Sequence, residues 1–267
     1  MKKLVGGPLV LLLLAATCGA QVRTRTGDFV TVFATHPLAP ERQDLHISYN
    51  LDPSSERFFV HVPATYTGDE AYGLIVFTDA DETITEVPPG WAGVLDSRKF
   101  LFVAAENAGN EQDTNRRLGL AVLGALEMMK RYRVDPRRVY AAGYSGGGRM
   151  SGLLGFYQPE IFRGTIQNCG ADFYKPVPSV YARSWLSTSG RPYGVLDATA
   201  EEIARARQVR FVLITGTNDF RHGNVLDIYN GGFVREKFQV KLFDVPGMGH
   251  DTCDGATLAA ALEFLAG

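Results

Sequence analysis

A serine flanked by glycines marks the stretch of the chain with the clearest capacity for chemistry. Residues 143–147 read Gly-Tyr-Ser-Gly-Gly, and they stand between an apolar run at 139–142 and a helix-compatible segment at 150–157. A G-x-S-x-G sequence joining a strand to a helix makes a turn so tight that side chains two residues from the serine would collide with backbone. Such a turn presents the hydroxyl at the positive end of a helix. The pattern predicts that Ser145 is a nucleophile; the alternative is a glycine-rich turn that only packs closely.

A serine hydroxyl needs a base to take its proton and a third group to orient that base. Asp219 directly follows a predicted strand at 209–215, and His250 follows another at 240–245. The polar segment at 21–55 is predicted to be an irregular or edge-strand lead-in. The other four histidines lie in this lead-in, within a predicted strand, or in the loop of Asp219 itself: His36, His46, His61 and His222. We therefore predict that His250 is the base and Asp219 the orienting acid.

Strands and helices alternate along the chain. Strands are predicted at 57–62, 73–78, 99–105, 139–142, 164–169, 209–215 and 240–245, and helices at 91–96, 114–132, 150–157, 198–207, 225–238 and 256–266. Near-continuous apolar strands separated by helices predict a doubly wound, mostly parallel α/β sheet with helices on both faces. In such sheets functional residues follow the carboxyl ends of the strands. That edge is predicted to carry Asp79, Asn107, Ser145, Asp219 and His250.

Three segments together resemble the α/β-hydrolase superfamily: the serine turn, Gly-Thr-x-Asp at 216–219 and Gly-Met-Gly-His at 247–250. The chain is most similar to secreted polyhydroxybutyrate-depolymerase-like and feruloyl-esterase-like ester hydrolases, over nearly its whole length after residue 20. The resemblance implies hydrolysis of a small or polymeric ester through an acyl-enzyme, with no cofactor and no metal. In that mechanism Ser145 attacks, His250 carries the proton and Asp219 holds His250.

One departure from that superfamily concerns the oxyanion hole. Its members usually have His-Gly after the third strand, whereas residues 77–82 here read Phe-Thr-Asp-Ala-Asp-Glu. The backbone N–H of Gly146 is expected to be one donor, and the second is expected from the backbone of Asp79 or Ala80. Acidic side chains beside a developing oxyanion would oppose it unless they point away or are paired.

The same acidic stretch keeps a second enzyme class open. Asp79-x-Asp81-x-Thr83 is similar to the motif of haloacid-dehalogenase-type phosphatases, in which Asp79 would be the nucleophile, Asp81 the acid, and carboxylates would hold Mg²⁺. No suitably placed lysine lies between this motif and Asp219, and the serine turn and His250 would have no role. The third alternative is a non-catalytic binding protein with a hydrolase fold. The presence of all three triad residue types argues against it.

Aromatic residues near the predicted edge are candidates for the substrate pocket. Tyr144, Trp91, Trp185 and Phe220 lie on or near its loops, with core or lid packing as the alternative role. The segment 175–199 is rich in Pro, Ser and Tyr and is predicted to be a lid within the single domain 21–267.

The first twenty residues have the pattern of a secretory signal peptide. A basic start, an apolar run at 4–16 and small residues up to Ala20 predict cleavage after Ala20 and export to the periplasm or the exterior. The run is too short for a comfortable membrane span. Lipid attachment at Cys18 is the alternative, although residues 15–17 fit that signal poorly. A formal charge of −2 without a basic stripe argues against nucleic-acid partners.

Export also affects how the two remaining cysteines are interpreted. Cys169 ends a predicted strand, and Cys253 lies three residues after His250. In an oxidising compartment the pair could form a disulfide that ties down the histidine loop. The alternative is two buried free thiols.

Overall fold

The computed structural model describes residues 25–33, 51–52, 54–181 and 198–267. The predicted signal peptide, Trp185 and most of the predicted lid lie outside these residues. Among the described residues, no helix combines the length and the apolar character needed to cross a membrane.

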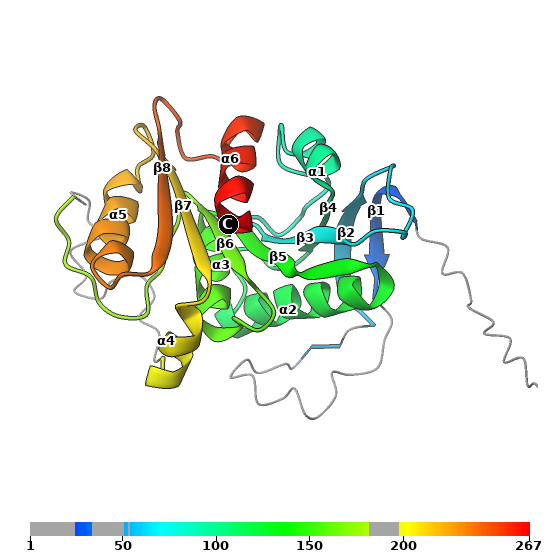
Figure 1. The fold of residues 1–267 in the computed structure, drawn as a ribbon, viewed down its shortest axis with the longest axis horizontal. Coiled ribbons are helices and arrows are strands. Elements are labelled where there is room, and N and C mark those ends of the chain that lie inside the picture. The colour runs from blue at the N-terminus through cyan, green and yellow to red at the C-terminus, as the bar shows by residue number, and fades with distance from the viewer. Residues whose placement is uncertain (1–24, 34–50, 53, 182–197) are drawn as a thin grey trace, which may run out of the picture.

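One eight-stranded sheet organises the chain, in the spatial order β1-β2-β4-β3-β5-β6-β7-β8 (Figure 1). The strands are β1 (Gly27–Val32), β2 (Arg57–Val62), β3 (Tyr72–Thr78), β4 (Phe100–Ala105), β5 (Val134–Tyr144), β6 (Gly164–Asn168), β7 (Arg210–Gly216) and β8 (Gln239–Val245). The pairs β1–β2 and β2–β4 are antiparallel, and all other neighbours are parallel. The interior strands are buried on both faces, which is why they are apolar almost without interruption.

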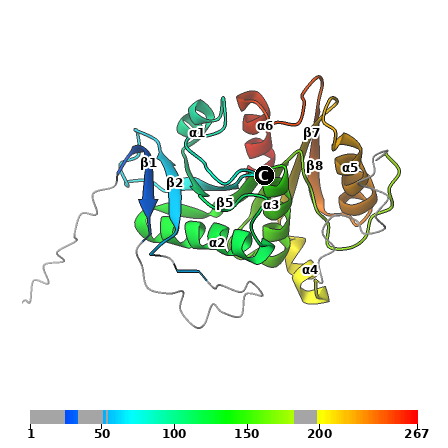
Figure 2. The same cartoon turned by 180° about the vertical axis from the view of Figure 1, so that it is seen from behind.

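Helices cover both faces of the sheet, as the sequence predicts. They are α1 (Ala92–Arg98), α2 (Thr114–Arg131), α3 (Gly146–Tyr157), α4 (Ala200–Ala206), α5 (His222–Asp227), the π-type helix η3 (Ile228–Val234) and α6 (Gly255–Ala266). The two views place α1 and α6 on one face and α2 and α3 on the other (Figures 1 and 2).

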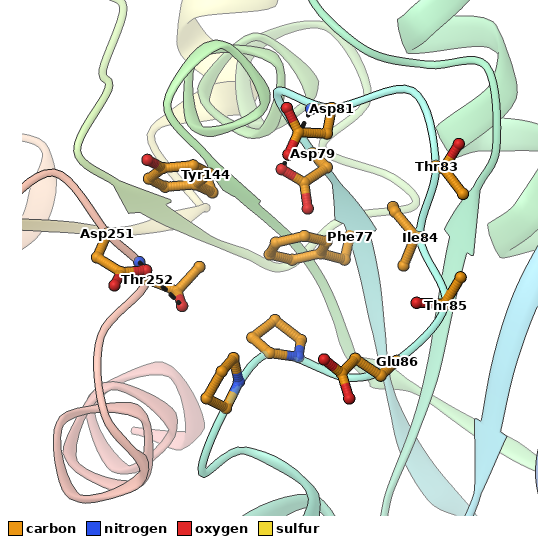
Figure 3. A pocket seen from close by; sticks show the side chains of 12 residues that line it. Phe77, Asp79, Asp81, Thr83, Ile84, Thr85, Glu86, Tyr144, Asp251 and Thr252 are labelled. Atoms are coloured by element: carbon orange, nitrogen blue, oxygen red, sulfur yellow. Dashed lines mark hydrogen bonds between the residues drawn. The ribbon is translucent and has the colours of Figure 1, made fainter.

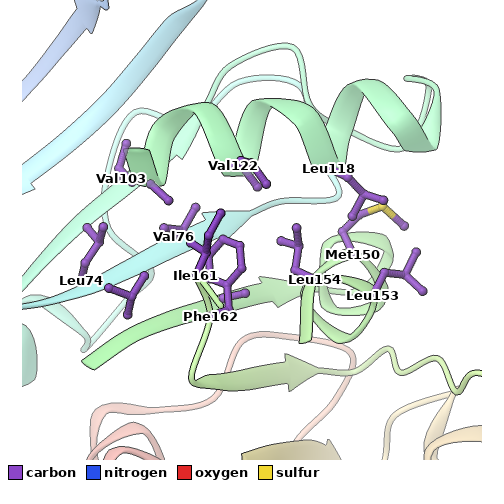
Figure 4. Close-up of a cluster of buried hydrophobic side chains, with 14 of the residues drawn as sticks. Leu74, Val76, Val103, Leu118, Val122, Met150, Leu153, Leu154, Ile161 and Phe162 are labelled. Atoms are coloured by element: carbon purple, nitrogen blue, oxygen red, sulfur yellow. The ribbon is translucent and has the colours of Figure 1, made fainter. Parts of the chain in front are cut away.

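Each face has its own hydrophobic core. Side chains of α2, α3 and η3 pack with one set of strand residues, and those of α1 and α6 pack with the alternate set. Figure 4 shows the α2 and α3 side chains over β3 and β4. Because successive strand residues point to opposite faces, neighbours such as Val76 and Phe77 belong to different cores.

The structure refines three sequence expectations. The polar lead-in contributes an antiparallel edge strand, β1. β5 begins before Pro136, beside a register shift opposite β3, which is where a strand tolerates proline. The helix expected at 225–238 begins at His222 and continues in wider turns through η3.

Candidate active site

Ser145 lies in a sharp turn between β5 and α3, with φ 53° and ψ −114°. Its N–H donates to the carbonyl of Asn168 at 2.8 Å. A Cβ on Gly143 would lie 2.2 Å from the carbonyl oxygen of Gly147, and one on Gly147 would lie 1.8 Å from that of Thr78. Backbone occupies both places, so the turn requires glycine at each position.

Three side chains from three strand ends form a chain of hydrogen bonds. Ser145 Oγ lies 2.9 Å from His250 Nε2, and His250 Nδ1 lies 2.6 Å from Asp219 Oδ1. With the proton on Nδ1, the imidazole donates to the carboxylate and accepts from the serine hydroxyl. The structure therefore brings together the three residues expected to form a triad, in the geometry that makes a serine nucleophilic.

The carboxylate of Asp219 is fully buried but well supplied with donors. Burial raises its pKa, and hydrogen bonds from His250, the Arg221 N–H and the Thr215 hydroxyl outweigh this and hold the pKa below its ordinary value. The Arg221 N–H donates to Oδ1 and the Thr215 hydroxyl to Oδ2, both at 2.9 Å. Asp219 is thus an anion at neutral pH, able to stabilise an imidazolium on His250.

Cys169, Asp219 and His250 are also the one group among the described residues whose side chains could hold a metal ion, with ligand atoms within 4.8 Å of one another. Two features disfavour that role. Burial strongly raises the pKa of the Cys169 thiol, which opposes the thiolate that a metal needs. The 2.6 Å between His250 Nδ1 and Asp219 Oδ1 is shorter than the roughly 3.3 Å that separates two tetrahedral zinc ligands at ordinary bond lengths.

The loop after β3 holds the remaining predicted oxyanion donors. The Ala80 N–H donates to Asp79 Oδ1 at 2.6 Å, so it is not available to an oxyanion in this structure. Gly146 begins α3 directly after Ser145, and Asn110 Oδ1 would lie 1.8 Å from a Cβ there. The backbone N–H groups of Gly146 and Asp79 are the candidates that remain.

Arg117, which the sequence reasoning missed, anchors this loop from α2. Its guanidinium donates to the carbonyls of Asp79 (2.9 Å) and Ala108 (2.7 Å) and to Asn110 Oδ1 (3.4 Å). Burial lowers the pKa of Arg117 to about 10, which leaves it charged at neutral pH. An arginine near the start of an amphipathic helix carries no sequence signal for such a role, because two of its three partners are backbone carbonyls, one of them 38 residues away.

The predicted substrate aromatics fall into different environments. The Phe220 ring lies 4.2 Å from the His250 ring, and the Phe220 side chain is exposed. Tyr144 is half-buried, and its hydroxyl donates to the His250 carbonyl at 2.7 Å. The prediction that Trp91 lines the substrate pocket is wrong. Trp91 is completely buried in the core under α1, and its indole N–H donates to the Cys253 carbonyl. Trp185 lies outside the described residues.

A pocket of about 250 Å³ opens beside the serine turn. Figure 3 shows its walls: residues from the 77–89 segment, Tyr144 from β5, and residues 251–252 from the histidine loop. None of its lining residues is basic. Four carboxylates line it: Asp79, Asp81, Glu86 and Asp251. Burial raises the pKa of Asp79, although hydrogen bonds from the backbone of Asp81 and Ala80 act in the opposite direction.

No protein-family model matches the sequence, and no curated protein matches it significantly. Solved structures do match the fold. A ferulic acid esterase has a TM-score of 0.57 at 17% identity, over 90% of this chain and 98% of that one. A poly(3-hydroxybutyrate) depolymerase from Bordetella parapertussis has a TM-score of 0.53 at 17% identity, over 77% and 81%. An S-formylglutathione hydrolase from Staphylococcus aureus has a TM-score of 0.57 at 12% identity, over 79% and 93%. The protein has the α/β-hydrolase fold.

Within this fold, the serine turn occupies the position of the nucleophile elbow, after the strand at the centre of the sheet. The phosphatase alternative has little support, because Asp79 is engaged by the backbone of Ala80 and Asp81. Among the described residues, neither Asp79 nor Asp81 belongs to a group of side chains that could hold a metal ion.

The predicted disulfide is absent, which is a second correction. Cys169 and Cys253 are both buried free thiols. The Cys169 thiol faces the carbonyls of Asp251 at 3.2 Å and Gly249 at 3.7 Å. The Cys253 side chain packs instead in the core beneath α1 and α6. The sequence brings the two segments to one edge of the sheet but cannot say which way each side chain turns.

Proposed function

We propose that this protein is a serine hydrolase that cleaves carboxylic esters through an acyl-enzyme. The observation that carries the proposal is the unbroken hydrogen-bond chain from Ser145 through His250 to Asp219 at the turn between β5 and α3. The fold it shares with esterases and a depolymerase is consistent with this chemistry but does not decide it, since one fold supports many activities.

In the proposed reaction Ser145 Oγ attacks the ester carbonyl while His250 Nε2 accepts its proton. Asp219 keeps the imidazole in the required tautomer and stabilises its charged form. The N–H of Gly146, at the positive end of α3, stabilises the oxyanion, and the Asp79 N–H is the proposed second donor. His250 then protonates the leaving alcohol, and water attacks the acyl group by the same route in reverse.

The acidic pocket bears on the substrate. Four carboxylates without a basic residue among them make a negative potential beside the nucleophile. We therefore expect neutral or cationic esters to be preferred over esters that carry a free carboxylate. The small volume favours short acyl or alcohol groups, or the end of a longer polymer.

Two further elements of the proposal rest on the sequence. Export follows from the signal-peptide pattern of residues 1–20, and a lid follows from the composition of 175–199. The first part of that segment is held by Asp227, whose Oδ1 accepts from the N–H groups of Val180 (2.7 Å) and Tyr181 (2.8 Å).

The proposal is tested by a panel of chromogenic short-chain, aromatic and polyester substrates, with an aryl phosphate beside them. Ester hydrolysis that persists in a chelator and is lost in Ser145→Ala supports it. Metal-dependent phosphate release that is lost in Asp79→Asn would instead support the phosphatase. If the wild type binds esters but hydrolyses none of the substrates, the non-catalytic alternative is supported.

A further inference from the structure

The loop that carries His250 is held by side chains from several elements. The Tyr144 hydroxyl from β5 donates to the carbonyl of His250 itself, and Asn168 Oδ1 from β6 accepts from the Cys253 N–H at 3.2 Å. The carbonyls on either side of His250, those of Gly249 and Asp251, face the thiol of Cys169. Of these side chains, only Cys169 contacts both the residue before His250 and the residue after it.

Cys169 directly follows β6 and is completely buried. Its backbone N–H donates to the carbonyl of Ile214 at 2.8 Å, and a Cβ on the next residue, Gly170, would lie 2.0 Å from the carbonyl oxygen of Ser145. The residue is therefore wedged between β7, the serine turn and the histidine loop. Its side chain cannot move far without displacing one of them.

The thiol has one proton to donate, two loop carbonyls within hydrogen-bond reach, and the Asp219 carboxylate close by, whose pKa the thiol helps to lower. Besides the two loop carbonyls, its sulfur is grouped with Asp219 and His250, all within 4.8 Å of one another. Burial, and then the negative charge of Asp219, strongly raises the pKa of the thiol. At neutral pH it therefore remains an S–H donor that faces the acid of the triad as well as the histidine loop.

We propose that Cys169 is a positioning residue for the triad, whose thiol fixes the His250 loop through the Asp251 and Gly249 carbonyls and shares its proton with the Asp219 carboxylate. This inference rests on the proposed hydrolase function. It gives a role to a buried nucleophilic group that the reaction itself does not use. The free thiol restrains the histidine loop without a covalent bond.

Two consequences follow for a variant that lacks the thiol. The loop gains freedom, so the Ser145–His250 distance is held less tightly and kcat falls, whereas substrate contacts and KM are retained. The Asp219 carboxylate loses a donor and directs more of its charge at the imidazole, which favours the imidazolium. The acid limb of the kcat/KM profile therefore moves to higher pH. The titratable groups that face His250 in this region are Asp219 after β7, Tyr144 on β5, Cys169 after β6 and Asp251 on its own loop.

The experiment compares Cys169→Ala with Cys169→Ser, which keeps a donor, and with Cys253→Ala, which removes an equally buried thiol from the α1–α6 core. We expect Cys169→Ala to lower kcat by about tenfold with little change in KM, since small misplacements of reacting groups are costly, and to shift the acid limb upward. Cys169→Ser should restore much of both. Cys253→Ala should lower Tm and leave the acid limb in place.

Three outcomes would overturn the inference: an unmoved acid limb in Cys169→Ala, an effect equal to that of Cys253→Ala, or no recovery in Cys169→Ser when its Tm matches that of the wild type. The rate at which a phosphonate labels Ser145 in each variant separates this inference from the proposed function. If wild type is not labelled, the proposed function fails. If wild type and Cys169→Ala are labelled at the same rate, only the role of Cys169 fails.

Discussion

Gly147→Ala is the smallest change that should disable the proposed site without touching a reacting group. The new Cβ would lie 1.8 Å from Thr78 O and 2.5 Å from Thr78 C, where contacts below 3.0 Å essentially do not occur. The end of β3 and the start of α3 must therefore separate by at least 3.0 − 1.8 = 1.2 Å. Both atoms are backbone, so no side-chain rotation can relieve the contact.

That displacement falls on the segment that leads directly into Asp79 and on the helix that begins with Gly146. A misplacement of about 1 Å can cost about a hundredfold in rate, so we expect kcat/KM to fall by about that factor. The strain of an overpacked site is typically about 1–3 kcal/mol, and for a domain of this size it should lower Tm by several degrees.

Gly93→Ala is the matched control. Gly93 lies in α1, and no heavy atom lies within 4 Å of a Cβ built there. The same added methyl should leave activity unchanged and stabilise the helix by up to about 1 kcal/mol. The assay is kcat/KM on a short-chain chromogenic ester together with Tm. A Gly147→Ala variant that matches Gly93→Ala in activity would refute the claim that close backbone contact at this turn sets the geometry.

The remaining predictions concern charge. Burial raises the pKa of Asp79, so the free energy of unfolding falls as the pH rises through that pKa and the buried carboxyl ionises. Asp79→Asn, which keeps an acceptor for the Ala80 N–H, should therefore have a higher Tm than wild type at pH 7. The difference should vanish below about pH 4, where the unfolded-state acid is also protonated, and parallel Tm–pH curves would contradict this. Matched esters that differ only in a terminal trimethylammonium, tert-butyl or carboxylate group should show the carboxylate as the poorest substrate in kcat/KM. Asp81→Asn and Glu86→Gln should each narrow that gap, whereas Glu160→Gln, an exposed acid beyond the far end of α3, should not; equal kcat/KM for the three esters would remove the pocket from the account.

The sequence predicted the alternation of strands and helices because β-branched and apolar runs are buried on both faces of this sheet. It also predicted that Ser145, Asp219 and His250 lie at one edge of the sheet, because parallel strands deliver the residues that follow them to one edge, and the structure brings these three side chains together there. Gly143 and Gly147 leave a local signal, since a Cβ at either position would collide with backbone.

Side-chain direction and long-range contacts to backbone could not be predicted. Trp91 stands near the predicted edge in the sequence, but its ring turns into the core and donates to the histidine loop. Cys169 and Cys253 reach the same region, yet one thiol turns to loop carbonyls and the other to apolar side chains. Arg117 gives no signal at all, since its two shortest hydrogen bonds go to backbone carbonyl oxygens, which every residue possesses.

Covalent labelling shows directly whether Ser145 is the nucleophile. A fluorophosphonate probe should modify the intact protein once, with the adduct mapped to the peptide that contains Ser145. Ser145→Ala should abolish labelling, and His250→Gln should slow it severely, because the serine would lose the base 2.9 Å from its oxygen. An adduct on another residue, labelling that persists in Ser145→Ala, or full-rate labelling in His250→Gln would contradict the account.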